Sequence, residues 1–197
     1  MSTWPPGPVT LAGRHATLVP LAPEHAPGLA AAVRDGEAWR LWYTSVPEPE
    51  GMAAEVERRL SLLAAGTMVP FTVLDAAGEP AGMTTFMNIP PETRRLEIGS
   101  TWYASRVRRT AVNTECKRML LGHAFDTLGC IAVEFRTHRF NAESRRAIER
   151  LGARLDGILR NHQVVGGVLR DTAVYSITAE EWPTVRRHLD WELERPR

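Results

Sequence analysis

The sequence predicts a single α+β domain, with a mixed and mostly antiparallel sheet of seven strands and helices on both of its faces. Apolar and polar residues alternate between residues 69 and 103, which indicates consecutive antiparallel strands. Residues 95–137 then show the order strand, long helix, strand, which is typical of a crossover between parallel strands. A length of 197 residues suits one sizeable core and is short for two.

The flanking segments complete this sheet. Residues 1–12, which are rich in proline, are expected to precede the domain as a lead-in, and residues 13–197 to form it. Proline at 23 and glycine at 36 are typical of the first turn and the end of a helix. The predicted strands cover residues 14–21, 69–74, 80–89, 95–103, 131–137, 153–164 and 169–178, and the predicted helices cover 23–33, 52–65, 113–128, 141–151 and 180–194.

Composition and charge exclude several classes of function. The formal net charge is +1, so no general positive field draws the chain to nucleic acid or to an anionic membrane. No apolar run approaches the ~20 residues that span a bilayer, and the N-terminus lacks the features of a signal peptide. Cys116 and Cys130 form neither a CxxC pair nor a cluster with histidine. We therefore expect a cytoplasmic protein with reduced thiols and no metal.

A basic loop precedes the longest predicted helix. Arg106, Arg108 and Arg109 lie just before a helix that is expected to begin at Asn113. The first amides of a helix lack partners within it and carry partial positive charge, so they favour a phosphate group. Forked arginine side chains add further donors. On these residues alone, the loop is either a pyrophosphate cradle or a solvated basic turn.

Asn141 opens the next predicted helix, directly after a strand. Asparagine is a favourable helix cap, and that role alone would explain its position. At the carboxyl end of a strand, its side-chain amide would also lie beside a ligand that passes between the two helix-bearing strands.

Several ordered motifs resemble those of the GCN5-related N-acetyltransferases (GNAT). Residues 97–102 (EIGSTW), followed by the basic loop and its helix, resemble the central coenzyme A motif of that family. Residues 141–153 (NAESRRAIERLGA) resemble its second motif. Four later segments resemble the closing signature of the RimJ/RimL branch, whose named members acetylate the N-termini of ribosomal proteins. They are GILR at 157–160, LRDT at 169–172, YSI at 175–177 and EWP at 181–183.

The resemblance implies that acetyl-coenzyme A is the donor and that the loop amides bind its pyrophosphate. Arg106 and Ala111 match the family pattern, whereas Arg109 occupies a position where glycine is expected. Because glycine permits a positive φ, arginine there implies a more open loop or a guanidinium in place of an amide contact. Gly99 is the expected place of the β-bulge beside which pantetheine pairs. The predicted coenzyme-binding residues are Thr101, Trp102, Tyr103, Arg106, Arg108, Arg109, Thr110, Ala111, Asn113, Asn141, Ser144 and Arg145.

Transfer of an acetyl group to an amine is helped by a base, by a donor to the oxyanion and by a proton for the departing thiolate. Glu97, beside the expected bulge, is the predicted base and would act through water. The alternative is a carboxylate paired with a neighbouring arginine, Arg94 or Arg95.

The proton donor is less well defined. The resemblance implies a tyrosine seven positions after the motif asparagine, where this sequence has Ile148. Ser144 is the predicted replacement, and Tyr103 and water are its rivals. Cys116 as an acyl-carrying nucleophile is a further alternative.

The acceptor is expected opposite the coenzyme. The aromatic residues after the first helix either wall this site or pack in the core; they are Trp39, Trp42 and Tyr43. Polar residues near strand ends are expected to face the same cleft, namely Asn88, Arg94 and His138, of which His138 is alternatively a surface histidine. The expected partner is an amine-bearing small molecule or a protein N-terminus, bound by a monomer or homodimer, with no nucleic acid and no membrane.

Two other classes of function stay open. Arg109 and the missing tyrosine favour a coenzyme A-binding regulatory module without turnover. The arginine loop would suit a nucleic-acid-binding protein, which is disfavoured because no aromatic residues interleave with the arginines.

Overall fold

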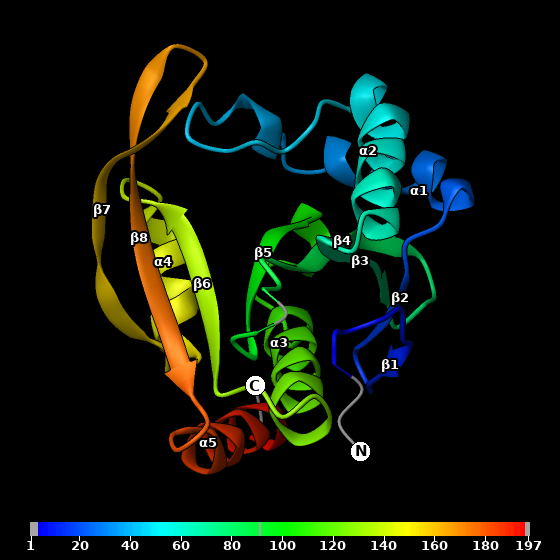
Figure 1. The fold of residues 1–197 in the computed structure, drawn as a ribbon. Coiled ribbons are helices and arrows are strands. Elements are labelled where there is room, and N and C mark those ends of the chain that lie inside the picture. The colour runs from blue at the N-terminus through cyan, green and yellow to red at the C-terminus, as the bar shows by residue number, and fades with distance from the viewer. Residues whose placement is uncertain (1–3, 91, 196–197) are drawn as a thin grey trace.

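Eight strands form one continuous sheet in the computed structural model, which describes residues 4–90 and 92–195 (Figure 1). Their spatial order is β1-β2-β3-β4-β5-β6-β8-β7, and neighbours are antiparallel except for β5 and β6. The predicted α+β class is confirmed, with one strand more than expected. The strands are β1 (Leu11–Ala12), β2 (Ala16–Pro20), β3 (Met68–Asp75), β4 (Pro80–Met87), β5 (Arg95–Tyr103), β6 (Ala132–His138), β7 (Arg154–Val165) and β8 (Val168–Thr178).

Helices cover both faces of the sheet. Successive side chains of a strand point to opposite faces, and in β4 Thr84 bonds to Lys117 of α3 whereas Thr85 bonds to Arg59 of α2. The first face carries α1 (Ala26–Arg34) and α2 (Met52–Ala64), and the second carries α3 (Val112–Gly122), α4 (Ala142–Arg150) and α5 (Trp182–Glu194) (Figure 1). Among the described residues, no helix is both long and apolar enough to cross a membrane.

Glu115 of α3 ties the N-terminal segment to this framework. Its carboxylate accepts hydrogen bonds from the amides of Arg14, His15 and Ala16 at 2.9, 2.6 and 2.8 Å. A buried carboxylate is tolerated when several donors satisfy it, so this contact fixes the start of β2 against α3.

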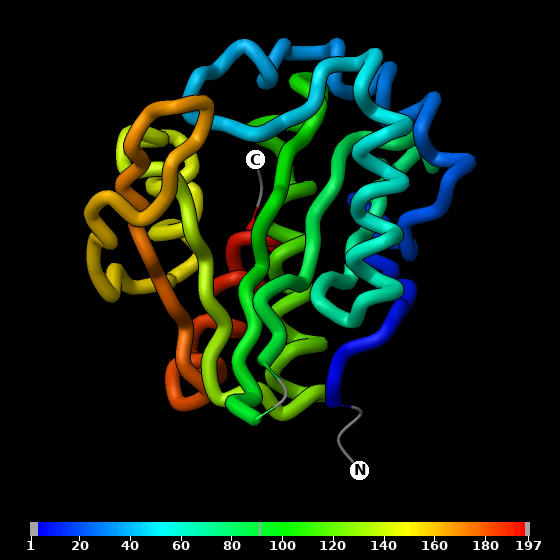
Figure 2. The backbone as a smooth tube through the Cα atoms, turned by 45° about the horizontal axis from the view of Figure 1, so that its top comes forward, coloured from blue at the N-terminus to red at the C-terminus, as the bar shows by residue number. Residues whose placement is uncertain are grey.

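β5 and β6 separate after a short stretch of pairing. Residues 95–97 pair with residues 132–134, and the recorded register ends there. Figure 2 shows the two strands close together at one end of the sheet and diverging toward the other. The opening lies toward the carboxyl ends of both strands, which is where ligands bind in sheets with this connection.

A β-bulge interrupts β5 within this opening. Thr85 pairs with Gly99 and Met83 with Trp102, so two residues of β5 face Thr84 alone. Ser100 has a φ of 47°, which is left-handed. The bulge was expected at Gly99 and lies one residue later, because the contacts described below hold the Ser100 backbone in place.

Two other predictions require correction. β1 lies inside residues 1–12, which were expected to precede the domain, and a strand of two residues is too short to show a periodic pattern. The helix expected over 113–128 is α-helical only to Gly122 and continues as a π-helical turn, His123–Thr127. Because Ala124 and Phe125 in that turn remain buried, the apolar pattern does not reveal the change.

Candidate active site

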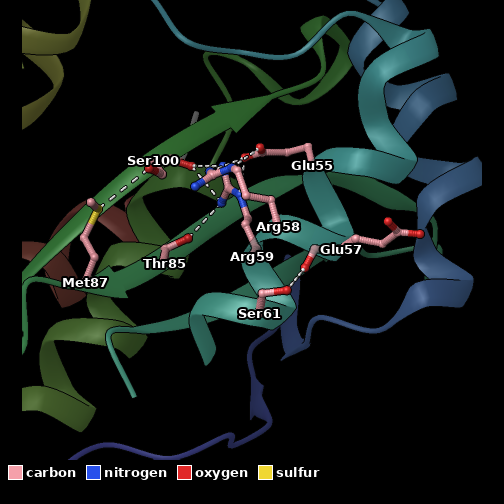
Figure 3. Close-up of polar contacts among 8 residues, drawn as sticks. All are labelled: Glu55, Glu57, Arg58, Arg59, Ser61, Thr85, Met87 and Ser100. Carbon is pink, nitrogen blue, oxygen red and sulfur yellow. Dashed lines mark hydrogen bonds and ion pairs between the residues drawn. The ribbon is translucent and has the colours of Figure 1, made fainter. Parts of the chain in front are cut away.

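Arg59 holds the bulge from the α2 face (Figure 3). Both of its Nη atoms donate to the carbonyl oxygen of Ser100 at 3.3 Å, and Nη1 also donates to Thr85 Oγ1 at 2.8 Å. Glu55, one turn earlier in α2, accepts a hydrogen bond from Arg59 Nε at 2.7 Å. A buried charge is tolerated when it is paired and hydrogen-bonded, so this network can fix the unfavourable backbone at Ser100.

Lys117 holds the same bulge from the α3 face. It is the only lysine among the 24 lysine and arginine residues of the chain. Its Nζ donates to Thr84 Oγ1 at 3.0 Å and to Thr101 Oγ1 at 2.8 Å, and both partners are neutral. Burial lowers the pKa of Lys117 to about 8. Unlike an arginine, this cation can therefore lose its charge within reach of neutral pH.

Glu97 lies where β5 and β6 begin to diverge. Its side chain is buried, and burial raises its pKa above the ordinary value for glutamate, although Asn88 and Arg136 act in the opposite sense. Asn88 Nδ2 donates to Glu97 Oε2 at 2.7 Å, and Arg136 Nε lies 3.6 Å from the same oxygen. A buried carboxylate with a raised pKa is a stronger base than an exposed one, which suits the role of a general base.

A cavity of about 520 Å³ opens beside Glu97, and Asn88 lines it as well. Glu134, which pairs with Glu97 across the two strands, accepts from Arg95 Nη2 at 2.6 Å and from Arg136 Nη2 at 2.9 Å. Arg95 is therefore occupied by Glu134 rather than by Glu97.

Arg94 lies apart from this cavity, contrary to the expectation that it would face the cleft. Its backbone has a φ of 47°, and its carbonyl oxygen accepts from the amide of Ile131 at 2.9 Å. Its guanidinium lies against the turn at Gly129. Arg94 therefore does not line the cavity beside Glu97.

The basic loop keeps the backbone conformation that glycine would favour. Arg109 has a φ of 58°, in the left-handed region. None of the hydrogen bonds among the described residues uses the amides of Arg109, Thr110 or Ala111, which directly precede the first residue of α3. Arginine at this position thus changes the side chain of the motif and leaves its backbone shape in place.

The three loop arginines have different surroundings. Arg106 Nη2 donates to Asp75 Oδ2 at 3.0 Å, so this arginine ties the loop to the β3–β4 turn. Arg108 Nε donates to the carbonyl oxygen of Tyr103 at 3.2 Å, which leaves its Nη atoms for a ligand. Arg109 is exposed and forms no ion pair within the described part of the chain. Arg108 and Arg109 are therefore the arginines that can reach a bound anion.

The predicted coenzyme residues of β5 turn their side chains into the protein. Thr101 bonds to Lys117, and Trp102 is buried in the core. The Tyr103 hydroxyl is buried beside Cys116; burial raises the pKa of Tyr103 well above its ordinary value and that of Cys116 to about 12. These values do not suit Tyr103 as the proton donor or Cys116 as a nucleophile, so β5 offers a ligand mainly its backbone.

At the start of α3, the remaining predicted residues are close to the loop amides. Thr110 Oγ1 donates to the carbonyl oxygen of Val107 at 2.7 Å, Ala111 is buried, and Asn113 is half-buried in the first turn.

At the start of α4, Asn141 Oδ1 accepts from the amide of Ser144 at 3.0 Å, which is the helix cap. The cap uses only the oxygen of the Asn141 amide. Arg145 Nε donates to the Tyr175 hydroxyl at 2.8 Å, so this arginine already has a partner. Ile148 is buried, as its apolar side chain requires.

An aromatic cluster lies at the carboxyl end of β6. The Trp42 ring is 5.0 Å from the His138 ring, and Tyr43 is 6.0 Å from it, measured between centroids. His138 is only 6% exposed, so it is not a surface histidine. Trp39 packs against the core instead. Trp42, Tyr43 and His138 line a second cavity of about 260 Å³, where the segment after α1 meets the tip of the β7–β8 hairpin (Figure 1).

The sequence profile of the GNAT acetyltransferase domain matches residues 15–154, well over half of the chain. The chain belongs to the GNAT acetyltransferase family. The chain is 30% identical over 105 residues to YdaF of Bacillus subtilis (strain 168), which is provisionally named a ribosomal N-acetyltransferase. The match covers 53% of the chain and 57% of YdaF, so it spans little more than half of that relative. It agrees with the predicted RimJ/RimL-like branch.

Solved structures share the fold of this chain over nearly its whole length. A GCN5-related N-acetyltransferase from Brucella melitensis superposes with a TM-score of 0.86 and 34% identity, covering 95% of this chain and 86% of that one. RimJ of Mycobacterium smegmatis, in complex with CoA-disulfide, gives a TM-score of 0.77 and 23% identity, covering 96% and 95%. The second comparison shows a common fold alone.

Four residues of the candidate site were not predicted from the sequence: Arg59, Lys117, Glu134 and Arg136. Glu134 and Arg136 depend on the register of β6 against β5, which a single sequence does not fix. Arg59 lies beside Arg58 in a helix pattern that does not distinguish the two. Lys117 did carry a signal, because it is the only lysine in an arginine-rich chain.

Proposed function

We propose that the chain is an N-acetyltransferase that moves an acetyl group from acetyl-coenzyme A to a primary amine, by direct attack within a ternary complex. The observation that carries this proposal is Glu97, a desolvated carboxylate with a raised pKa at the point where β5 and β6 diverge. Family membership supports the donor class, and the position and raised pKa of Glu97 support its role as the base.

In the proposed reaction, the amine nitrogen forms a bond to the acetyl carbon and the carbon–sulfur bond then breaks. Glu97 takes the amine proton through water, so the nucleophile is neutral when it attacks. A backbone amide of β5 is the proposed donor to the oxyanion. The thiolate of coenzyme A receives a proton from Ser144 or from water, because Tyr103 is buried and has a raised pKa.

The proposed pyrophosphate site is the start of α3. The unpaired amides of Arg109, Thr110 and Ala111 are favourable donors to phosphate oxygens. Arg108 and Arg109 add charge there, and the nitrogen of the Asn141 amide lies at the start of the neighbouring helix α4.

The proposed acceptor is an amine on a small molecule or at a protein N-terminus, and the proposed setting is the cytoplasm. The name of YdaF, a ribosomal N-acetyltransferase, and the resemblance to the RimJ/RimL branch, whose named members acetylate protein N-termini, both support a protein N-terminus. Trp42, Tyr43, Asn88 and His138 line the two cavities from which such an amine would approach Glu97.

The test is release of free thiol from acetyl-coenzyme A in the presence of a mixed panel of amines, amino acids and short peptides, with products read by mass spectrometry. We expect an acetylated amine and an equal amount of coenzyme A thiol. No product across the panel, with coenzyme binding retained in calorimetry, would instead favour a coenzyme A-binding module without turnover.

A further inference from the structure

Arg170 of β8 is a half-buried arginine without a protein partner. Its Nε is buried and has no hydrogen-bond partner, and no ion pair or hydrogen bond within residues 4–90 and 92–195 involves its guanidinium. Burial lowers its pKa, the charge of Glu97 acts in the opposite sense, and an arginine stays charged in either case. A desolvated charge with unused donors is costly unless a partner completes it.

Arg170 lies on the open side of the sheet, in the lining of the second cavity. His138 and Thr172 are the last pair between β6 and β8, so Arg170 lies beyond the end of β6, on the open side of the sheet. Burial raises the pKa of Glu97 and lowers that of His138, and the charge of Arg170 lowers both. Arg170 also lines the 260 Å³ cavity together with Trp42.

The acidic groups around Arg170 are already used. Asp171, its neighbour in the chain, accepts from the amide of Asn161 at 2.8 Å and from Arg139 Nη1 at 3.3 Å. Glu134 is bound by its own two arginines, as described above. Glu97 is hydrogen-bonded by Asn88 at 2.7 Å and has Arg136 beside it. Within this group, the charge left uncompensated is the positive charge of Arg170.

The geometry points to Arg170 as the specificity residue for the acceptor: it binds a carboxylate that the acceptor carries close to its amine, while the aromatic cavity beside Trp42 receives an apolar group. This inference rests on the proposed function. The forked guanidinium suits a carboxylate because it can donate two parallel hydrogen bonds. The positive charge also disfavours a protonated amine nearby, which helps to keep the nucleophile neutral.

A carboxylate next to an amine occurs in two kinds of acceptor, a free amino acid and a peptide whose second residue is acidic. Two matched pairs separate them: phenylalanine against phenylalaninamide, and alanyl-aspartyl-alaninamide against alanyl-asparaginyl-alaninamide. We expect the KM of the carboxylate member to be lower by about 10- to 100-fold in one pair, as for a hydrogen-bonded charge. The pair that shows the preference identifies the source of the carboxylate.

The variant Arg170→Met should abolish this preference by raising the KM of the carboxylate member alone, and Arg170→Lys should restore part of it. The control variant Arg139→Met removes a cation just after the end of β6 that is already paired with Asp171. This variant should keep the preference for the carboxylate member. Urea unfolding and coenzyme A calorimetry on each variant verify folding. Equal KM values within both pairs for the unmodified enzyme, or an unchanged preference in Arg170→Met, would overturn the inference.

A binding measurement separates this inference from the proposed function. Calorimetry needs no turnover. It would measure, in the presence of coenzyme A, the binding of N-acetylphenylalanine against its amide and of the acetylated form of one peptide against that of the other. Tighter binding of one carboxylate compound that is lost in Arg170→Met supports the carboxylate site even if no amine is acetylated. Equal binding within each pair, in an enzyme that does acetylate amines, would remove the role of Arg170 and leave the proposed function intact.

Discussion

The opening between β5 and β6 has two walls, one formed by β5 and the other by β6 with its neighbour β8, and the two walls are built differently. On the β5 wall, Arg59 and Lys117 hold the bulge from opposite faces, and Glu97 is hydrogen-bonded by Asn88. The β8 wall ends in a hairpin tip at residues 164–169 that exposes several apolar side chains, and it carries Arg170 without a partner. Arg59, Lys117 and Glu97 on the first wall all have protein partners, whereas Arg170 on the second has none.

This difference separates two tasks. Groups that take part in bond formation need fixed positions, since small displacements are costly to catalysis. Groups that select a substrate are completed by the substrate, so they carry unused donors and exposed apolar surface in its absence. We therefore expect changes on the β5 wall to affect turnover or folding, and changes on the β8 wall to affect acceptor choice.

The largest effect should come from Glu97→Gln, which removes the proposed base. We expect kcat to fall by about 10²- to 10⁴-fold with coenzyme affinity retained. The base must be ionised to act, so activity of the unmodified enzyme should rise with pH through the raised pKa of Glu97, and the variant should lose this rise. The control Glu134→Gln removes a neighbouring carboxylate, and its activity should still rise with pH. Unchanged turnover in Glu97→Gln would exclude Glu97 as the base.

Arg59→Met should be the most destabilising change on the β5 wall. It leaves Glu55 without its buried partner and Ser100 without the contacts that hold its backbone, and losing one member of a buried pair costs about 3–5 kcal/mol. Arg58→Met is the matched control, because Arg58 binds the same Glu55 (Figure 3) with a side chain that is 54% exposed rather than 3%. The control should cost about 1 kcal/mol or less in urea unfolding. Equal losses would contradict a special role for Arg59.

Lys117 should make stability depend on pH. Its pKa is lowered to about 8 in the folded protein, so the unfolded chain binds this proton more tightly and stability should rise as pH increases from about 8 to about 10.5. Relative to Lys117→Met, we expect the unmodified protein to gain about 2 kcal/mol between pH 7 and 9.5. The difference between the two proteins is the quantity to measure, because the buried thiols of Cys116 and Cys130, whose pKa values are raised to about 12, act in the opposite direction. A constant difference across this range would show that Lys117 keeps its ordinary pKa.

The smallest effect concerns the loop. Arg109→Gly should raise the free energy of unfolding by about 0.5–1 kcal/mol, because glycine avoids the penalty of a left-handed residue but loses more chain entropy. Arg108→Gly is the control: Arg108 has a φ of −68°, so glycine there should destabilise the protein. Coenzyme affinity in Arg109→Gly then reports what the arginine charge adds. Destabilisation by Arg109→Gly would indicate that its side chain stabilises the folded loop.

Periodicity and motifs predicted the strands, the helix cap and the basic loop because these features are set by residues close together in the sequence. The alternation of β3 to β5, the helix cap at Asn141 and the loop before α3 depend on neighbours in the chain. The bulge could not be placed, since glycine at 99 is a favourable site but Arg59 stabilises the strained backbone at Ser100. The partners of Glu97 were missed for a similar reason, because they depend on strand register rather than on local sequence.

The bulge contact of Lys117 also determines how the protein responds to acylating agents. Within these 197 residues it is the only ε-amine, and it is 5% exposed. The folded chain therefore presents no surface lysine to an activated thioester, and its many arginines stay protonated and are poor nucleophiles. An acyl donor held in the site thus has no accessible lysine of the same chain to modify. A lysine-directed label would react at Lys117 only when the structure opens, so that single residue would report unfolding of the bulge.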